Sequence, residues 1–190
     1  MSRTDYQSKG TVLLSTVHGS RLYGLNHSNS DDDRYIVTGG FGKRARQTLA
    51  ANDDVIVVSY EKFVDMLYNG TPQAVEALFS EVADVHLLTH LRDSYLASNT
   101  RLVHRYLKTI KSFALTDVSD ERVVFKRRRH ALRLADNLNE IVLSGRFDVR
   151  LSDSKAALFT EWARMDFESY MTRLETMLHV TESESYLRGE

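Results

Sequence analysis

The sequence predicts an α+β fold, in which a small mixed β-sheet with flanking helices is followed by a C-terminal helical region. Short runs of β-branched and apolar residues, bounded by glycines or acids as strands often are, gather in the N-terminal part of the chain. From about Asp84 the apolar residues instead recur almost wholly at helical spacing. No repeat or proline-rich linker separates the two patterns. We therefore expect residues 1–83 to form a core and residues 84–190 a helical region packed on it.

The composition excludes several classes of protein. With 190 residues, 42% of them hydrophobic, the chain is long enough to bury one core. The absence of cysteine excludes disulfides, thiolate zinc sites and cysteine nucleophiles, and no apolar run is long enough to cross a membrane. A formal net charge of −1 argues against tracking along a long nucleic-acid duplex. Because the N-terminus begins no signal peptide, a cytoplasmic location is expected.

The first predicted strand covers residues 11–18 and ends at a turn that suits an anion. The segment is β-branched and apolar, lies between Gly10 and Gly19, and delivers the pair Gly19-Ser20 at its C-terminal end. Such a turn presents backbone N–H groups and a hydroxyl at close range to a bound anion.

A cluster of aspartates opens the second predicted strand, residues 31–37, after a loop rich in Gly, Asn and Ser. Because side chains alternate along a strand, Asp31 and Asp33 are expected on one face, about 7 Å apart along the backbone, with Asp32 on the other. Two carboxylates at this spacing can share a pair of divalent cations. With the Gly-Ser turn, they predict a site for a metal-bound triphosphate.

The rest of the N-terminal part alternates between strand and helix. Residues 41–52 are expected to be a connection with solvated basic side chains, and residues 54–58 a third strand that again opens on acids. Ser59 can cap a helix that runs through Asn69, and Thr71-Pro72 can begin another, in which Glu76 is expected on the polar side.

The C-terminal part carries three apolar stripes at helical spacing. A glycine after Ser144 ends the middle helix, and Ser152 or Ser154 can cap the last one. The stripes are Leu102, Val103, Tyr106, Leu107, Ile110 and Phe113, then Ala131, Ala135, Leu138 and Val142, then Leu158, Trp162, Met165, Leu174 and Leu178.

The middle helix also carries a basic run, residues 126–130, most of which is expected to be solvated. Lys126, His130, Arg133 and Asn137 recur at spacings that place them on one polar face opposite the apolar stripe.

The motifs around the predicted turn and acids resemble the DNA polymerase β-like nucleotidyltransferase superfamily. Its signature is an apolar residue, here Val17 or a neighbour, then Gly19-Ser20, a short loop, and the pair Asp31 and Asp33. The fuller strings Gly-Ser-Arg-x-Tyr-Gly and Ser-Asp-x-Asp resemble the predicted nucleotidyltransferases of bacteria and phages. That branch usually has an apolar residue between the acids and an Arg two places after the second. This chain has Asp32 between the acids, and Arg34 one place early.

The resemblance implies the nucleotidyltransferase fold, with residues 1–83 as the catalytic core, and a set of site residues. Asp31, Asp33 and Asp54 are the implied catalytic acids and the implied ligands of two Mg²⁺ ions, with Mn²⁺ as an alternative. Asp53 is the reserve for the third acid, and spacing alone would make both Asp53 and Asp54 ordinary turn acids.

The implied nucleotide-binding residues are Gly19, Ser20, Arg21, Tyr23, His130 and Arg133. For Tyr23, stacking on a base and simple packing of the loop both remain open. His130 and Arg133 either face the nucleotide or belong to an exposed helix face.

The implied activity is transfer of a nucleoside monophosphate, AMP from ATP by analogy, to an acceptor hydroxyl with release of pyrophosphate. The acceptor is unidentified and could be an RNA end, a protein or a small molecule. The alternative is a non-catalytic nucleotide-binding regulator or antitoxin-like protein. Retention of all three acids counts against it, because a simple binder has little reason to gather repelling carboxylates.

Overall fold

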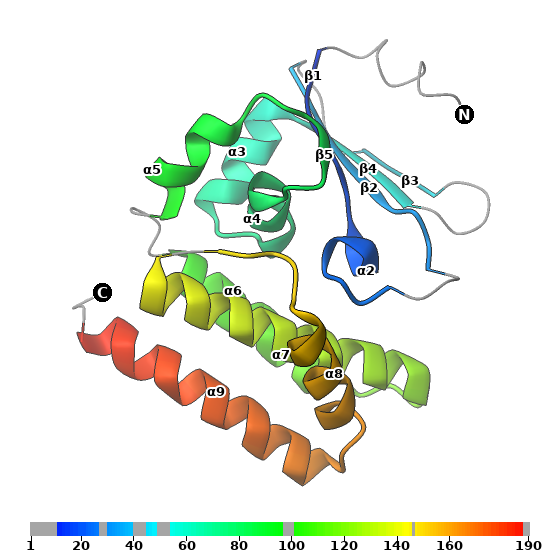
Figure 1. Ribbon diagram of the computed structural model, residues 1–190, viewed down its shortest axis with the longest axis vertical. Coiled ribbons are helices and arrows are strands. Elements are labelled where there is room, and N and C mark those ends of the chain that lie inside the picture. The colour runs from blue at the N-terminus through cyan, green and yellow to red at the C-terminus, as the bar shows by residue number, and fades with distance from the viewer. Residues whose placement is uncertain are drawn as a thin grey trace. The chain divides into compact units, whose positions relative to one another are not determined.

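The computed structural model describes residues 11–26, 30–39, 45–48, 54–96, 101–145 and 147–187. The chain divides into two compact units, Met1–Tyr95 and Leu96–Glu190. The N-terminal unit contains a mixed sheet with flanking helices, and the C-terminal unit is helical (Figure 1). The predicted α+β class is confirmed. Among the residues described, no helix has both the length and the apolar content needed to span a membrane.

The N-terminal unit is built on a five-stranded sheet with the order β3-β4-β2-β1-β5. Its central strand β2 pairs antiparallel with β1 and parallel with β4, so the sheet is mixed. β5 pairs antiparallel with the other side of β1, and β3 antiparallel with β4. The strands are β1 (Val12–Val17), β2 (Arg34–Thr38), β3 (Ala45–Thr48), β4 (Asp54–Ser59) and β5 (Ala83–His86).

Three features of this sheet differ from the sequence prediction. β2 begins at Arg34, so Asp31 and Asp33 precede the strand and the expected alternation does not fix their directions. β3 lies in the segment that was expected to be only a connection. β5 lies where helical periodicity was expected to begin, because it completes the sheet by pairing with β1.

The helices of this unit are α2 (Gly19–Leu22), α3 (Tyr60–Tyr68), α4 (Pro72–Phe79) and α5 (Arg92–Leu96), with a 3₁₀ turn, η2 (Thr89–Leu91). The predicted caps of α3 are confirmed, since the Ser59 hydroxyl accepts from the Lys62 N–H and Asn69 ends the helix. Figure 1 shows α3 and α4 together on one face of the sheet. On that face Tyr35 of β2 and Phe63 of α3 are fully buried, with ring centroids 6.3 Å apart.

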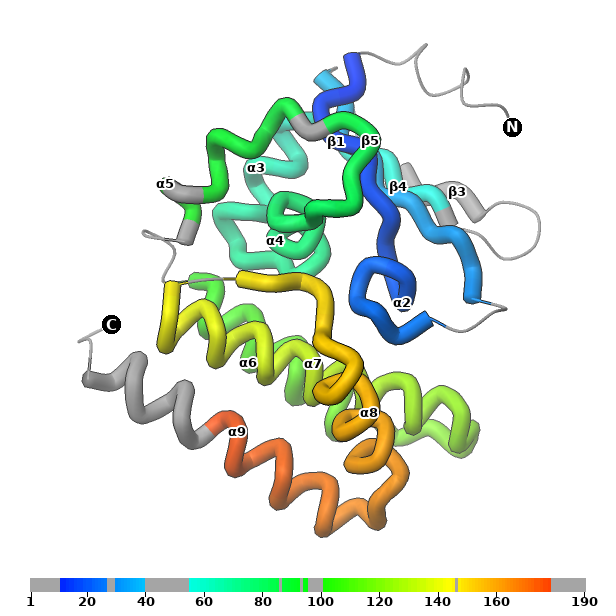
Figure 2. Tube along the Cα trace, in the orientation of Figure 1, coloured from blue at the N-terminus to red at the C-terminus, as the bar shows by residue number. Residues whose placement is uncertain are grey.

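The C-terminal unit consists of α6 (Arg101–Ala114), α7 (Glu121–Ser144), α8 (Asp153–Trp162) and α9 (Phe167–Leu187). The long helix α7 packs against α6 and α9 (Figure 2). Its buried residues include Ala131, Leu134, Ala135 and Leu138. Gly145, at φ 63°, ends α7 as expected, and Ser152 caps α8. The third predicted stripe is divided, because the chain turns after Trp162 and begins α9 at Phe167.

Candidate functional site

The candidate site lies at one end of the sheet, where three chain segments meet. β1 finishes there at Val17, and its antiparallel partner β2 begins opposite it at Arg34. β4 runs parallel to β2 and also begins at this end. Figure 2 shows β1 leading directly into α2, which starts with the Gly-Ser pair. The pairing of β1 with β2 therefore brings the turn and the aspartate segment together, although they are separated in the sequence.

Two contacts hold the turn against the aspartates. The His18 backbone N–H donates to the Asp33 carbonyl oxygen at 2.8 Å, which extends the β1–β2 pairing by one step. Gly19 has φ +66°, and a Cβ built on it would stand 2.6 Å from Asp33 Oδ2. Glycine is needed here for two reasons: the left-handed backbone, and the closeness of the Asp33 carboxylate.

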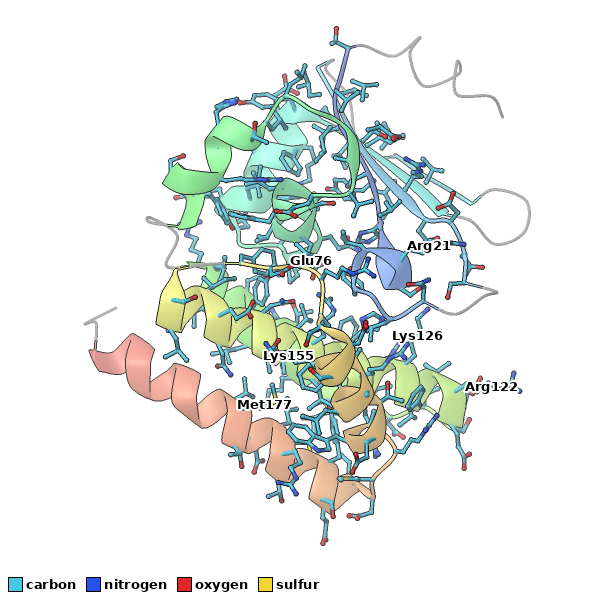
Figure 3. All side chains as sticks on the ribbon, viewed as in Figure 1. Arg21, Glu76, Arg122, Lys126, Lys155 and Met177 are labelled. Carbon is cyan, nitrogen blue, oxygen red and sulfur yellow. The ribbon has the colours of Figure 1, made fainter. Side chains whose placement is uncertain are left out.

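Arg21 holds the loop that precedes β2 against the same turn. Its Nε atom donates to the Asp31 carbonyl oxygen at 3.1 Å and its Nη2 atom to the Ser30 carbonyl oxygen at 2.9 Å. Asp32 Oδ1 lies 3.8 Å from the same Nε, a partly exposed ion pair. Arg21, which is labelled in Figure 3, therefore positions the loop on which the candidate metal ligands Asp31 and Asp33 lie. Asp31 is exposed and Asp33 is half-buried.

The strand register bears on the third acid. Arg34 of β2 pairs with Val55 of β4, so Asp33 and Asp54 each occupy the position immediately before a paired residue. Asp54, the first residue of β4, therefore begins its strand at the same end of the sheet as Asp33. The side chain of Asp54 and the whole of Asp53 lie outside the described residues.

The two described acids suit a magnesium ion held jointly with a substrate. No group of three or more potential ligands occurs among the described His, Asp and Glu residues. Mg²⁺, however, is commonly bound by one or two carboxylates together with substrate phosphates. Asp31 and Asp33 supply carboxylates on a loop fastened to the Gly19-Ser20 turn, and an added Cβ at Gly19 would fill the space beside Asp33.

Tyr23 and Glu76 form a buried hydrogen bond that sequence reasoning did not find. The Tyr23 hydroxyl donates to Glu76 Oε2 at 2.6 Å, and the two residues are 4% and 1% exposed. The expectation that Glu76, which is labelled in Figure 3, lies on a polar side is wrong, because nearly all of α4 is buried. Tyr23 closes α2 by donating its backbone N–H to the Gly19 carbonyl oxygen. With its ring buried, Tyr23 packs the loop and offers no open face to a base.

Arg34 has a structural partner at the edge of the site. Its Nη1 atom lies 2.6 Å from Asp84 Oδ2. β1 lies between the strands that carry these two residues, so the ion pair spans it. Both side chains are partly exposed, and such pairs typically stabilise by about 0–1 kcal/mol. This ion pair gives a reason for the arginine at position 34, which lies one place earlier than the arginine usual in the resembled branch.

The predicted polar face of α7 is more buried than an exposed helix face would be. Arg133 is 3% exposed and Asn137 fully buried, while Lys126 is exposed and His130 half-buried. Arg133 Nη1 donates to Asn137 Oδ1 at 3.0 Å, and Asn137 Nδ2 donates to the Asp148 carbonyl oxygen. The His130 ring lies 6.1 Å from that of Phe113. The alternative of a solvated face is therefore wrong for Arg133 and Asn137.

A family model matches most of the chain. The family model RlaP, described as an RNA repair pathway DNA polymerase beta family, matches residues 1–166. The match includes the whole sheet, the Gly19-Ser20 turn, the aspartate loop and α7. No curated protein matches the chain.

Proposed function

The chain belongs to the RNA repair pathway DNA polymerase beta family, and from that premise we propose that it transfers a nucleoside monophosphate to a hydroxyl of an acceptor, with release of pyrophosphate. The observation that carries this proposal is the contact between Gly19 and Asp33. A triphosphate held at the Gly-Ser turn would have Asp33 beside it. That juxtaposition suits phosphoryl chemistry better than simple nucleotide binding, which gains nothing from a carboxylate near phosphates.

Each site residue has a role in this proposal. Backbone N–H groups at Gly19 and the hydroxyl of Ser20 hold the β- and γ-phosphates. Asp31 and Asp33 would bind Mg²⁺, with Asp54 completing the set. When bound, Mg²⁺ would neutralise charge on the phosphates and make the acceptor hydroxyl more acidic.

The remaining steps belong to the chain's own groups. Asp54 helps to take the proton from the acceptor hydroxyl, whose oxygen attacks the α-phosphorus. The bond from that phosphorus to the bridging oxygen breaks, and pyrophosphate leaves. Arg21 keeps the aspartate loop on the turn, and Tyr23 acts through Glu76 to hold the end of α2. His130 and Arg133 are assigned to the triphosphate on the resemblance alone.

ATP is the proposed donor, and the end of an RNA strand is the proposed acceptor class. The donor rests on family analogy. The acceptor rests on the description of the family as part of an RNA repair pathway. An RNA end carries the free hydroxyl that this reaction requires.

The experiment supplies each of the four nucleoside triphosphates, labelled at the α-phosphate, with Mg²⁺ and one of three acceptor pools: RNA, protein or small molecules. Label should pass from ATP into RNA, and no label should pass from ATP labelled at the γ-phosphate. Label in protein or in small molecules would show that the acceptor is not RNA, while the proposed transfer reaction would stand. Binding of ATP with no transfer to any pool would favour the non-catalytic regulator.

A further inference from the structure

A pair of arginines in the C-terminal unit shares one aromatic ring. The Arg129 guanidinium of α7 lies 5.3 Å from the centroid of the Phe125 ring, and the Arg164 guanidinium, just after α8, lies 5.4 Å from it. Stacking of this kind uses the flat face of a guanidinium and leaves the N–H groups at its edge free to bind an anion. Two cations therefore lie within 5.4 Å of the centroid of one ring, and the charge of Arg164 acts on Arg129.

Arg129 is buried without the partner that a buried charge normally has. The residue is 7% exposed, and its buried Nε atom has no hydrogen-bond partner among the described residues. Burial lowers the pKa of Arg129, and the neighbouring charge of Arg164 lowers it further. Burying a charge without a partner is strongly unfavourable, so such groups are rare in proteins.

Two other cations of the same unit, Lys155 and Arg128, have their partners within the chain. Lys155 lies 2.9 Å from Asp136 and 3.3 Å from Glu140, and although burial acts to lower its pKa, these two acids raise it overall. Arg128 Nη1 donates to the Met165 carbonyl oxygen, and its guanidinium stacks on Tyr170 at 4.9 Å. Neither Arg129 nor Arg164 takes part in any ion pair found among the described residues.

No acid beside the pair in the sequence compensates it. The carboxylate of Asp166, close to Arg164 in the chain, accepts the Ser169 backbone N–H at 2.9 Å at the start of α9. That hydrogen bond is the main cause of the lowered pKa of Asp166. A bound anion would therefore supply the partner that no ion pair among the described residues gives the buried Arg129.

We infer that Arg129 and Arg164, held by Phe125, bind a backbone phosphate of the RNA acceptor. A phosphodiester is a singly charged anion with two non-bridging oxygens. A guanidinium group can donate two parallel hydrogen bonds to such a pair of oxygens. The identity of the ligand as RNA rests on the proposed function, whereas the need for an anion rests on the geometry of these three residues.

The test measures binding of a fluorescein-labelled single-stranded RNA by anisotropy, without nucleotide, at several salt concentrations. Arg164 is exposed, so Arg164→Gln should fold normally. It should weaken RNA binding about tenfold, the value of one hydrogen bond to a charged group, and reduce the slope of log affinity against log salt by about one. ATP affinity should not change. Unchanged RNA affinity and slope, or an equal loss of ATP affinity, would overturn the inference.

Arg173→Gln is the matched control, because Arg173 is also exposed and stacks at 5.4 Å on one aromatic ring, that of Trp162. Arg173→Gln should leave RNA affinity near wild type. If it lost as much RNA affinity as Arg164→Gln, the loss would come from general surface charge, and a local phosphate site would be contradicted.

A second measurement uses inorganic phosphate, which should raise the melting temperature of wild type more than that of Arg129→Met. Equal shifts would contradict the role of Arg129.

The outcomes separate this inference from the proposed function. RNA binding that depends on Arg164 but occurs without transfer would keep the phosphate site and reject the transferase. Transfer to RNA with no dependence of binding on Arg164 would keep the transferase and reject the phosphate site.

Discussion

Gly19 and Asp33 are so close that a single methyl group at Gly19 would stand 2.6 Å from Asp33 Oδ2. The two residues come from different sides of the β1–β2 pairing, and the hydrogen bond from His18 to the Asp33 carbonyl oxygen holds them in register. The fold thus places the proposed anion-binding turn and a potential metal ligand against each other, which is the arrangement that the proposed reaction needs.

Gly19→Ala should abolish transfer, because the added Cβ must displace the Asp33 carboxylate. Gly145→Ala is the matched control: Gly145 has nearly the same φ, 63°, with no atom within 4 Å of an added Cβ. Both variants should lose about 1–2 kcal/mol of unfolding free energy from the strained backbone. Urea unfolding and a transfer assay measure the two effects. Full transfer by a folded Gly19→Ala protein would show that the contact is not needed.

Tyr23→Phe should destabilise the N-terminal unit, because it removes the donor to a buried carboxylate. The expected loss is about 1–3 kcal/mol of unfolding free energy. Glu76→Gln and the double variant complete a thermodynamic cycle, and the pair should couple by about 0.5 kcal/mol or more. Simple addition of the two single losses would show that the hydrogen bond contributes nothing of its own.

Sequence reasoning found the parts of the site that depend on local chemistry. The Gly-Ser turn, the acids and the caps at Ser59 and Gly145 follow from preferences that act over a few residues. Sequence reasoning failed where segments distant in the sequence determine the burial and the partners of a residue. Glu76 was expected to be exposed, yet α4 is buried on nearly all sides and Tyr23, far away in sequence, supplies the partner.

The strands show the same division. β4 begins at Asp54 as predicted, because its β-branched run is distinctive. β5 is short and opens where helical spacing was expected, and it becomes a strand only because the edge of β1 is available for pairing. The sequence prediction started β2 too early, at residue 31. Asp31 and Asp32 instead lie on a loop that precedes the strand, and a hydrogen bond from Arg21 holds this loop in place.

Asp54→Asn should bind ATP almost normally but transfer very slowly, because the proposed acid acts on the acceptor oxygen and not on the β- and γ-phosphates. Asp53→Asn should stay near wild type, since the family resemblance favours Asp54 as the third acid and alternation along a strand lets only one of the two serve. Equilibrium binding and single-turnover rates measure the two quantities. An inactive Asp53→Asn would mean that the assignment is off by one residue.

Arg133→Ala should lower the stability of the protein and weaken ATP binding. The expected loss of binding free energy is roughly 1.5–3 kcal/mol, the value of a hydrogen bond to a charged group. Asn137→Ala is the comparison, because it removes the partner of Arg133 but no charge. It should lower stability with a smaller effect on affinity. Equal affinities for both variants would leave Arg133 a purely structural role.

The central claim is that Asp33 acts in nucleotidyl transfer. The most direct measurement is the rate at which ATP labelled at the α-phosphate labels RNA, compared between wild type, Asp33→Asn and Asp32→Asn, after each has been shown to be folded. Asp33→Asn should fall by roughly a hundredfold or more, since removing one preorganised group at a reacting phosphate costs on that order. Asp32→Asn should lose far less, because Asp32 lies 3.8 Å from the Arg21 Nε atom and is not one of the proposed metal ligands. A folded Asp33→Asn protein that transfers label as fast as wild type would contradict the account.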